Sequence, residues 1–364
     1  MASQAPTAGH HGAFHPLRVT AVDQLTDDSV AITLAIPAAL RDTFRHLPGQ
    51  HIAVRRFVDG AEIRRTYSIC TPAPDTAADP QSLQVGVRLV DGGEFSTYAL
   101  KQLGPGDTIE VMAPAGRFVL EPRAGSFAAI VGGSGITPVL SIATTLLERR
   151  TDTRFCLIRS DRTAASTMFL EEVADLKDRW PDRFQLVTAL SREEQQAGLV
   201  SGRLDEQRLA TLLPALLPVA SINGWFLCGP HGLVQGAERA LHALGVPRDR
   251  VHQEIFHVDD GASLAPSNRQ APSHSTVTAT LDGRSGRWPV QDGESLLETV
   301  LRNRADAPYA CKGGVCGTCR AFLVSGEVRM DRNFALEPEE VTAGYVLACQ
   351  SHPLDEEVEL DFDR

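Results

Sequence analysis

Four cysteines near the carboxyl end constrain this 364-residue chain more than any other feature. Four residues separate Cys311 from Cys316, two separate Cys316 from Cys319, and Cys349 follows after 29 more. The short loop also contains three glycines, which let a backbone wrap closely around a bound group: Gly313, Gly314 and Gly317. A chain with this pattern has to fold so that four sulfur atoms meet.

Thiolates at this spacing indicate an iron–sulfur cluster. Four soft sulfur ligands suit iron, and the spacing is that of plant-type [2Fe–2S] sites. Backbone N–H groups aimed at the sulfurs would stabilise the more negative reduced cluster and raise its potential. Zinc sites usually pair cysteines as two close couples, whereas here the fourth cysteine stands alone. Against a zinc knuckle or unrelated thiols, we predict that the metal ligands are Cys311, Cys316, Cys319 and Cys349.

Composition excludes several classes of protein. Seven cysteines without an export signal argue against a disulfide framework and predict a reducing compartment, the cytoplasm. The mean hydropathy is −0.12, and no apolar run approaches the roughly 20 residues that span a bilayer. A net charge of −11 argues against nucleic-acid binding. From His274 onward the chain has 9 basic and 16 acidic residues, which predicts docking to a positively charged partner.

Hydrophobic periodicity predicts two domains before the cysteines. Residues 14–122 contain alternating apolar runs separated by glycine and proline turns, a pattern typical of a small antiparallel β-barrel. In residues 123–257 strand-like runs alternate with helical periods, which predicts a parallel sheet with helices on both faces. The strands of this second domain are expected at 127–131, 154–159, 184–190 and 225–228.

The remaining segments differ in composition. Residues 258–273 are rich in Ala, Ser, Pro, Gly and Gln and predict a linker. Residues 274–364 form a third domain, with a strand expected at 277–281, a helix at 295–304 and then the cysteine loop. Residues 1–13 are predicted to be a disordered tail.

Two motifs of the first domain carry groups that bind a flat phosphorylated cofactor. The run Arg65-Thr66-Tyr67-Ser68 ends a predicted strand, and Gly92-Gly93-Glu94-Phe95-Ser96-Thr97 follows later. An aromatic face can stack on a heterocycle, an arginine can pair with phosphate, and hydroxyl and glycine N–H groups can hold a pyrophosphate. A tyrosine in a strand more often belongs to the core or rim, so the structural alternative stays open.

Two motifs of the second domain lie where strands meet helices. Glycines in Gly133-Ser134-Gly135-Ile136-Thr137-Pro138 allow a phosphate to approach the helix start, although a plain structural turn is an alternative because the spacing departs from Gly-x-Gly-x-x-Gly. Cys228-Gly229-Pro230 ends a strand, where the cysteine is either a small buried hydrophobe or faces the ligand crevice.

In this order the motifs resemble the ferredoxin–NADP reductase superfamily fused to a plant-type ferredoxin. Several stretches are similar to the reductase subunits of phenylacetyl-CoA epoxidases, and reductases of ketosteroid hydroxylases are similar but more distant. These stretches are Phe14–Leu17, Arg65–Cys70, Gly92–Thr97, Pro308–Ala310, Ala335–Pro338 and Cys349–Pro353.

The resemblance implies a three-part electron carrier: an FAD-binding β-barrel, an α/β nucleotide domain and a β-grasp-like α+β [2Fe–2S] domain. Hydride would pass from NADPH, or NADH, to FAD, and single electrons would pass through the cluster to a di-iron oxygenase that epoxidises phenylacetyl-CoA. A Rieske or ketosteroid oxygenase is the alternative recipient, and FMN the alternative flavin. An alternative of another class is a non-enzymatic Fe–S module that senses redox state or acts as a scaffold.

The resemblance also implies roles around the flavin. Tyr67 would stack on the flavin ring, Arg65 would pair with its phosphates, and Ser68 would lie near the flavin N5. Pyrophosphate contacts are expected from Gly93, Ser96 and Thr97, with Thr66 also in the flavin site.

Around the nicotinamide nucleotide, the resemblance assigns binding to Gly133, Gly135, Thr137, Gly229 and Pro230, with Cys228 beside the nicotinamide. Glu254 would poise the Ser68–Cys228 site, and Phe256 would cover the flavin. Ser191 and Arg192 match the pair that binds a 2′-phosphate, although an exposed charge at a strand end is the structural alternative. Without a further Lys/Tyr pair, NADPH is only moderately preferred over NADH.

Overall fold

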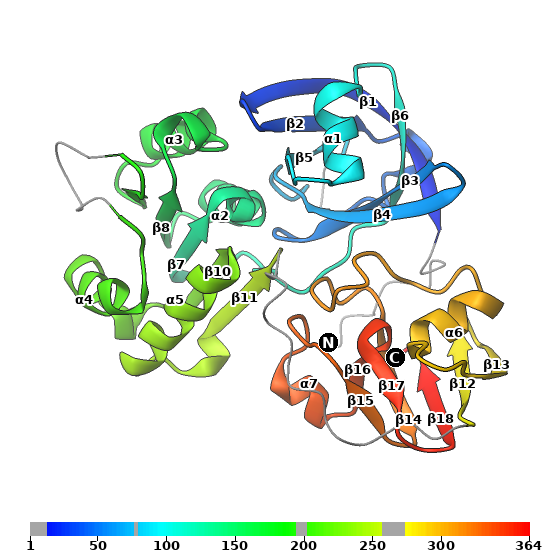
Figure 1. Cartoon of the computed structure of the whole chain (residues 1–364). Helices are drawn as coiled ribbons and strands as arrows, with labels where there is room; N and C mark the ends of the chain where they lie inside the picture. The colour runs from blue at the N-terminus through cyan, green and yellow to red at the C-terminus, as the bar shows by residue number, and fades with distance from the viewer. Residues whose placement is uncertain (1–12, 76–78, 194–201, 257–273) are drawn as a thin grey trace. The chain divides into compact units, whose positions relative to one another are not determined.

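A computed structural model describes residues 13–75, 79–193, 202–256 and 274–364 of the chain (Figure 1). Among these, the residues within 16–63 and 67–258 form one compact unit, and those within 1–15, 64–66 and 259–364 form a second. The predicted linker at 258–273 and the predicted tail, except for residue 13, lie outside the described residues.

Six antiparallel strands form the barrel that the alternating runs predict. They are β1 (Phe14–Thr26), β2 (Ser29–Ala35), β3 (His51–Val58), β4 (Ala61–Ser68), β5 (Ser82–Arg88) and β6 (Thr108–Met112), in the order β4-β3-β6-β1-β2-β5. A bridge from Ile69, directly after β4, to Val85 of β5 joins the two edge strands and closes the sheet. Val30, Ile32 and Leu34 lie in the barrel core, as their alternation predicts.

Helix α1 (Glu94–Lys101) was not predicted from the sequence. It lies between β5 and β6, and Phe95 and Ala99, four residues apart, are buried in the barrel core. Tyr98 packs against the same core, so the apolar positions 95, 98 and 99 span little more than one helical turn, and the helix begins directly after Gly92 and Gly93. A helix this short therefore gives little periodic signal.

The second domain is a parallel sheet with the order β11-β10-β7-β8-β9. Its strands are β7 (Gly125–Gly132), β8 (Thr153–Asp161), β9 (Phe184–Leu190), β10 (Gly224–Gly229) and β11 (Val251–Ile255), and its helices are α2 (Ile136–Arg149), α3 (Leu170–Arg179), α4 (Glu206–Leu216) and α5 (His231–Ala243). The predicted strand at 184–190 is confirmed at both ends, and the other three are each found one or two residues longer at either end. Strand order reverses beside β7, and such a reversal opens a ligand crevice at the carboxyl ends of the strands.

Both faces of this sheet are covered. Phe127, Ala129 and Val131 of β7 share a core cluster with residues of α2 and α3. Helix α5 packs on β7, β10 and β11, and its buried residues lie outside that cluster, which places α5 on the opposite face.

The carboxyl-terminal unit contains a mixed five-stranded sheet with the order β13-β12-β18-β14-β16. Its strands are β12 (Thr276–Leu281), β13 (Arg284–Pro289), β14 (Arg320–Ser325), β16 (Tyr345–Leu347) and β18 (Glu357–Asp361), while β15 (Val328–Met330) pairs with β17 (Ser351–Pro353). Helix α6 (Leu296–Asn303) starts at a capping box between Ser295 and Glu298, and α7 (Pro338–Thr342) follows β15. This is the α+β arrangement expected for the third domain.

No helix within the described ranges has both the length and the apolar character needed to cross a membrane.

Candidate redox sites

The end of β4 presents an aromatic ring and an arginine. Arg65 is exposed, Thr66 and Tyr67 are half-buried, and Ser68 is buried. The ring of Tyr67 lies 5.4 Å from the ring of Phe95, with the planes tilted by 38°. A supported aromatic ring beside an exposed guanidinium offers the two contacts that a flavin ring and its phosphates require.

Helix α1 brings the second flavin motif close to β4, because Phe95 belongs to its first turn. The hydroxyl of Ser96 accepts a hydrogen bond from the Val90 N–H and donates one to the Gly93 carbonyl, each at 3.1 Å. A Cβ at Gly93 would lie 2.6 Å from the Ser96 Oγ, so a side chain there would displace this hydroxyl. Ser96 thus shapes the turn, and the N–H groups at the helix start suit a pyrophosphate.

The glycine turn after β7 packs directly against the end of β10. Gly133 has φ +55°, and a short 3₁₀ turn over Gly133–Gly135 leads into α2. A Cβ at Gly135 would lie 2.2 Å from the carbonyl oxygen of Cys228. Thr137 is 1% exposed, and its hydroxyl donates to the Ser134 carbonyl at 2.9 Å. In this arrangement Thr137 holds the turn, and the glycines leave its backbone open to a phosphate.

Ser68, Cys228 and Glu254 come together from three strands. Cys228 is the register partner of Glu254 on β11, and the Ser68 hydroxyl donates to Glu254 Oε2 at 3.4 Å. Burial, with a smaller contribution from the Glu254 charge, raises the pKa of the Cys228 thiol well above its ordinary value. Cys228 is therefore a neutral thiol, and the three residues form one polar cluster at the strand ends.

His51 is a member of this group that the sequence did not reveal. Its Nδ1 lies 3.7 Å from Glu254 Oε1, and its side chain is 5% exposed. The ring Nε2 is buried without a hydrogen-bond partner among the described residues. A single histidine at the start of a strand gives no signal in the sequence. His51 lies beside Glu254 only because the folded chain brings the start of β3 close to β11.

The other predicted nucleotide residues lie at strand ends. Gly229, with φ +142°, and Pro230, the N-cap of α5, join β10 to that helix. Ser191 and the exposed Arg192 directly follow β9. Phe256 follows β11 and is 36% exposed.

The four predicted cluster cysteines form two pairs. A hydrogen bond from the Cys316 thiol lowers the pKa of Cys311, and one from the Cys319 thiol lowers the pKa of Cys349. Within the described residues no three His, Cys, Asp or Glu side chains are placed to hold a metal ion as one group. Two pairs of thiols fit a two-iron cluster, in which four cysteines serve two irons.

The loop around the cysteines has the backbone shape that such a cluster needs. The N–H of Gly313 donates to Cys311 Sγ at 3.3 Å. Gly314 has φ +78°, a Cβ there would lie 3.1 Å from the Arg332 carbonyl oxygen, and its own carbonyl accepts the N–H of Phe334 at 3.0 Å. The segment after β15 therefore covers the loop closely, and backbone donors surround the sulfurs.

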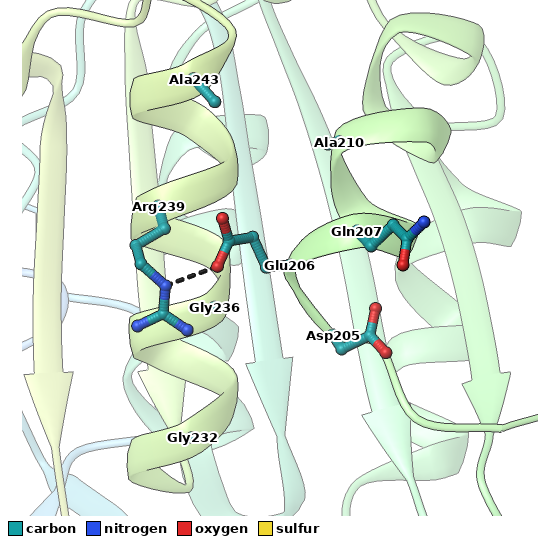
Figure 2. A pocket seen from close by; sticks show the side chains of 8 residues that line it. All are labelled: Asp205, Glu206, Gln207, Ala210, Gly232, Gly236, Arg239 and Ala243. Atoms are coloured by element: carbon teal, nitrogen blue, oxygen red, sulfur yellow. Dashed lines mark hydrogen bonds and ion pairs between the residues drawn. The ribbon is translucent and has the colours of Figure 1, made fainter.

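A groove of about 480 Å³ between α4 and α5 contains none of the predicted site residues (Figure 2). Figure 2 shows Arg239 and Glu206 joined across it, with an Nε–Oε2 distance of 2.5 Å. Gly232 and Gly236 line it, and the two helices approach closely at Gly236, where a Cβ would lie 3.3 Å from the Glu206 nitrogen.

Comparison with known proteins gives the same domain order. An oxidoreductase FAD-binding domain matches residues 16–120, an oxidoreductase NAD-binding domain matches 129–239, and a 2Fe–2S iron–sulfur cluster binding domain matches 279–354. The crystal structure of phthalate dioxygenase reductase has the same fold, with a TM-score of 0.58 and 24% identity over 96% of this chain and 98% of that one. The chain is thus an oxidoreductase with an FAD-binding, an NAD-binding and a 2Fe–2S cluster binding domain.

Two relatives narrow this class. A 1,2-phenylacetyl-CoA epoxidase subunit from Escherichia coli is 42% identical over 96% of this chain and 98% of its own length. The ferredoxin reductase component of 3-ketosteroid-9-alpha-monooxygenase from Rhodococcus rhodochrous is 32% identical over 95% and 96%. The chain belongs to the family of reductases that includes these two proteins. The predicted fold class, the resemblance and the flavin, nicotinamide and 2Fe–2S cofactors are confirmed.

Proposed function

We propose that this chain supplies electrons from NADPH to a di-iron oxygenase that epoxidises phenylacetyl-CoA. The observation that carries the proposal is the 42% identity to the 1,2-phenylacetyl-CoA epoxidase subunit of Escherichia coli, which extends over nearly the full length of both chains. The parts of the chain are a flavin domain at 14–122, a nucleotide domain at 123–257, a linker at 258–273 and a cluster domain at 274–364.

In the flavin domain, Tyr67 supports the ring system and Arg65 pairs with the phosphates, with Thr66 beside them. Gly93, Ser96 and Thr97 form the helix start that receives the pyrophosphate. This assignment is supported by the contact between Tyr67 and Phe95, which places the aromatic ring next to that helix start. Ser68 then lies at the buried end of the same strand, within hydrogen-bond distance of Glu254.

In the nucleotide domain, Gly133, Gly135 and Thr137 shape the phosphate turn, and Gly229 and Pro230 shape the neighbouring strand end. Cys228 and Glu254 orient the nicotinamide toward Ser68, while Phe256 covers the flavin. Ser191 and Arg192 receive a 2′-phosphate. The close approach of Gly135 to Cys228 supports this assignment because it places both strand ends at one point.

Cys311, Cys316, Cys319 and Cys349 would hold the cluster. When bound, the nicotinamide provides two electrons as hydride, the flavin divides them, and the cluster carries them singly. The residues named above would hold the nicotinamide and the flavin at a fixed distance and orientation. None of the seven cysteines forms a disulfide bond, which supports a reducing compartment, the cytoplasm.

A Rieske or ketosteroid oxygenase is the second candidate acceptor, favoured by the 32% identity to the reductase of 3-ketosteroid-9-alpha-monooxygenase. The non-enzymatic alternative is set aside, because the chain matches both an FAD-binding and an NAD-binding oxidoreductase domain.

The deciding experiment couples the purified holoprotein to each purified oxygenase component. We expect phenylacetyl-CoA and oxygen to stimulate NADPH oxidation only when the di-iron epoxidase component is present. Stimulation by the ketosteroid oxygenase and its substrate, with none by the di-iron component, would overturn the proposal in favour of the second candidate. Iron, acid-labile sulfide and extracted flavin, measured on the same preparation, establish that the protein is loaded.

A further inference from the structure

We propose that Asp28 and Arg162 set the nucleotide preference of this reductase. Arg162 acts with Arg192 as a ligand of the 2′-phosphate of NADPH, and Asp28, on the turn between β1 and β2, competes with that phosphate for Arg162. The inference rests on the proposed function, because it presupposes a dinucleotide at the carboxyl end of β7.

Arg162 lies where the adenosine ribose is expected. It directly follows β8, the neighbour of the strand that carries the glycine turn. In dinucleotide-binding sheets the ribose reaches the end of this second strand. The N–H of Arg192 donates to the Arg162 carbonyl at 2.9 Å, so the two arginines leave adjacent strand ends side by side.

The acidic residue at the end of β8, Asp161, is not available to contact the adenosine ribose. An acid there usually bonds the 2′-hydroxyl of NADH and repels a phosphate. Asp161 is instead buried in an ion pair with Arg159, with 2.8 Å between Nε and Oδ2 and both side chains 1% exposed. The Arg162 side chain is 48% exposed, so a solvent-accessible cation lies at this strand end instead.

Asp28 holds Arg162 from the barrel side. Its Oδ2 lies 2.9 Å from an Arg162 guanidinium nitrogen, and its Oδ1 accepts hydrogen bonds from Arg88 Nε at 3.1 Å and from Thr26 at 2.8 Å. Although partial burial raises it, the hydrogen bond from Thr26 and the charges of Arg88 and Arg162 lower the pKa of Asp28. The carboxylate is therefore charged at neutral pH.

The other acid nearby is already engaged. Glu193 Oε2 accepts the N–H of Ala164 at 3.1 Å, in the loop after β8. Asp28 is thus the carboxylate paired with Arg162 in the described structure, and a 2′-phosphate has to replace it.

The competition has a defined size. A partly exposed ion pair of this kind shifts an equilibrium by about 1.5- to 5-fold. A phosphate dianion can bind an arginine through two hydrogen bonds at once, so it displaces the single Asp28 contact. Asp28 should therefore weaken NADPH binding by that factor and leave NADH, which has no 2′-phosphate, unaffected.

The test uses the holoenzyme with ferricyanide as acceptor, so that neither the cluster nor an oxygenase is needed. We expect Asp28→Asn, which keeps the shape and loses the charge, to raise the ratio of kcat/KM for NADPH over NADH by about 1.5- to 5-fold. Arg162→Ala should lower the ratio at least about tenfold, and Asp28→Asn should have no effect in that background. Calorimetric binding of 2′,5′-ADP to the holoenzyme should change in parallel.

Two controls match these changes. Asp27→Asn removes the same charge from the neighbouring, exposed position, and Arg154→Ala removes an exposed arginine from the opposite end of β8. Both should leave the ratio unchanged. An unchanged ratio in Asp28→Asn, or an equal loss for both nucleotides in Arg162→Ala, would overturn the inference. If the wild type oxidised neither nucleotide, the proposed function itself would fail.

Discussion

Replacing Gly135 by alanine tests whether the nucleotide turn depends on direct packing of backbone on backbone. The added Cβ would lie 2.2 Å from the Cys228 carbonyl oxygen, 2.4 Å from its carbon and 2.7 Å from the Gly229 nitrogen. No side-chain rotation relieves these contacts, since all three atoms belong to the backbone. The turn or the end of β10 has to move until the closest distance exceeds 3.0 Å.

Overpacking of this kind costs about 1–3 kcal/mol, and a displacement of about 1 Å between reacting groups costs about 100-fold in rate. We therefore expect Gly135→Ala to lower kcat/KM for NADPH with ferricyanide about 100-fold and to lower the midpoint of urea unfolding followed by flavin release. The visible absorption of the cluster should be unchanged, because the cysteines belong to the other compact unit.

Gly232→Ala is the matched control. It adds the same methyl group to α5, where no atom lies within 4 Å of the new Cβ. Alanine in a helix is favoured over glycine by up to about 1 kcal/mol, so this variant should be as stable as the wild type or more so, with unchanged rate. A Gly135→Ala protein with wild-type rate and stability would refute the reasoning.

Three further predictions address the cluster and the stability of the fold. Cys316→Ser should lose iron and acid-labile sulfide and should not deliver electrons to cytochrome c, yet it should keep its NADPH–ferricyanide activity. Loss of both activities would contradict the view that flavin reduction does not depend on the cluster. Arg159→Met leaves the Asp161 charge buried without its partner and should lower the free energy of unfolding in urea by about 3–5 kcal/mol. Arg150→Ala, which removes an exposed ion pair, should change this free energy by nothing measurable. Equal effects of the two substitutions would be inconsistent with the buried pair. Burial lowers the pKa of His46 from its usual 6.5, so the unfolded chain binds the proton more readily than the folded chain. The free energy of unfolding therefore decreases as the pH falls through about 6.5, and His46→Gln should flatten this decrease between pH 7 and 5. Parallel curves of unfolding free energy against pH for the two proteins would rule out this role of His46.

Much of the fold was predictable because its signals are local. The sequence predicts both ends of β9, since the mostly apolar stretch Phe184–Leu190 is bounded by Pro181-Asp182-Arg183 before it and Ser191-Arg192 after it. Helix α1 is not predicted, because its apolar positions Phe95, Tyr98 and Ala99 span little more than one turn and directly follow a pair of glycines. The prediction for α6 lies within one residue of both ends, and its start coincides with the capping box of Ser295 and Glu298.

The sites divide in the same way. The sequence alone determined the cysteine quartet, the aromatic and arginine on β4 and the glycine turn, because each depends on residue types at short fixed spacing. Only the tertiary structure decided that Thr137 turns inward and that His51 lies beside Glu254. The pair of Asp28 and Arg162, 134 residues apart, forms because the barrel packs against the nucleotide sheet. Contacts between residues so far apart in the sequence depend on how whole sheets pack, and the local sequence around one partner does not predict the other.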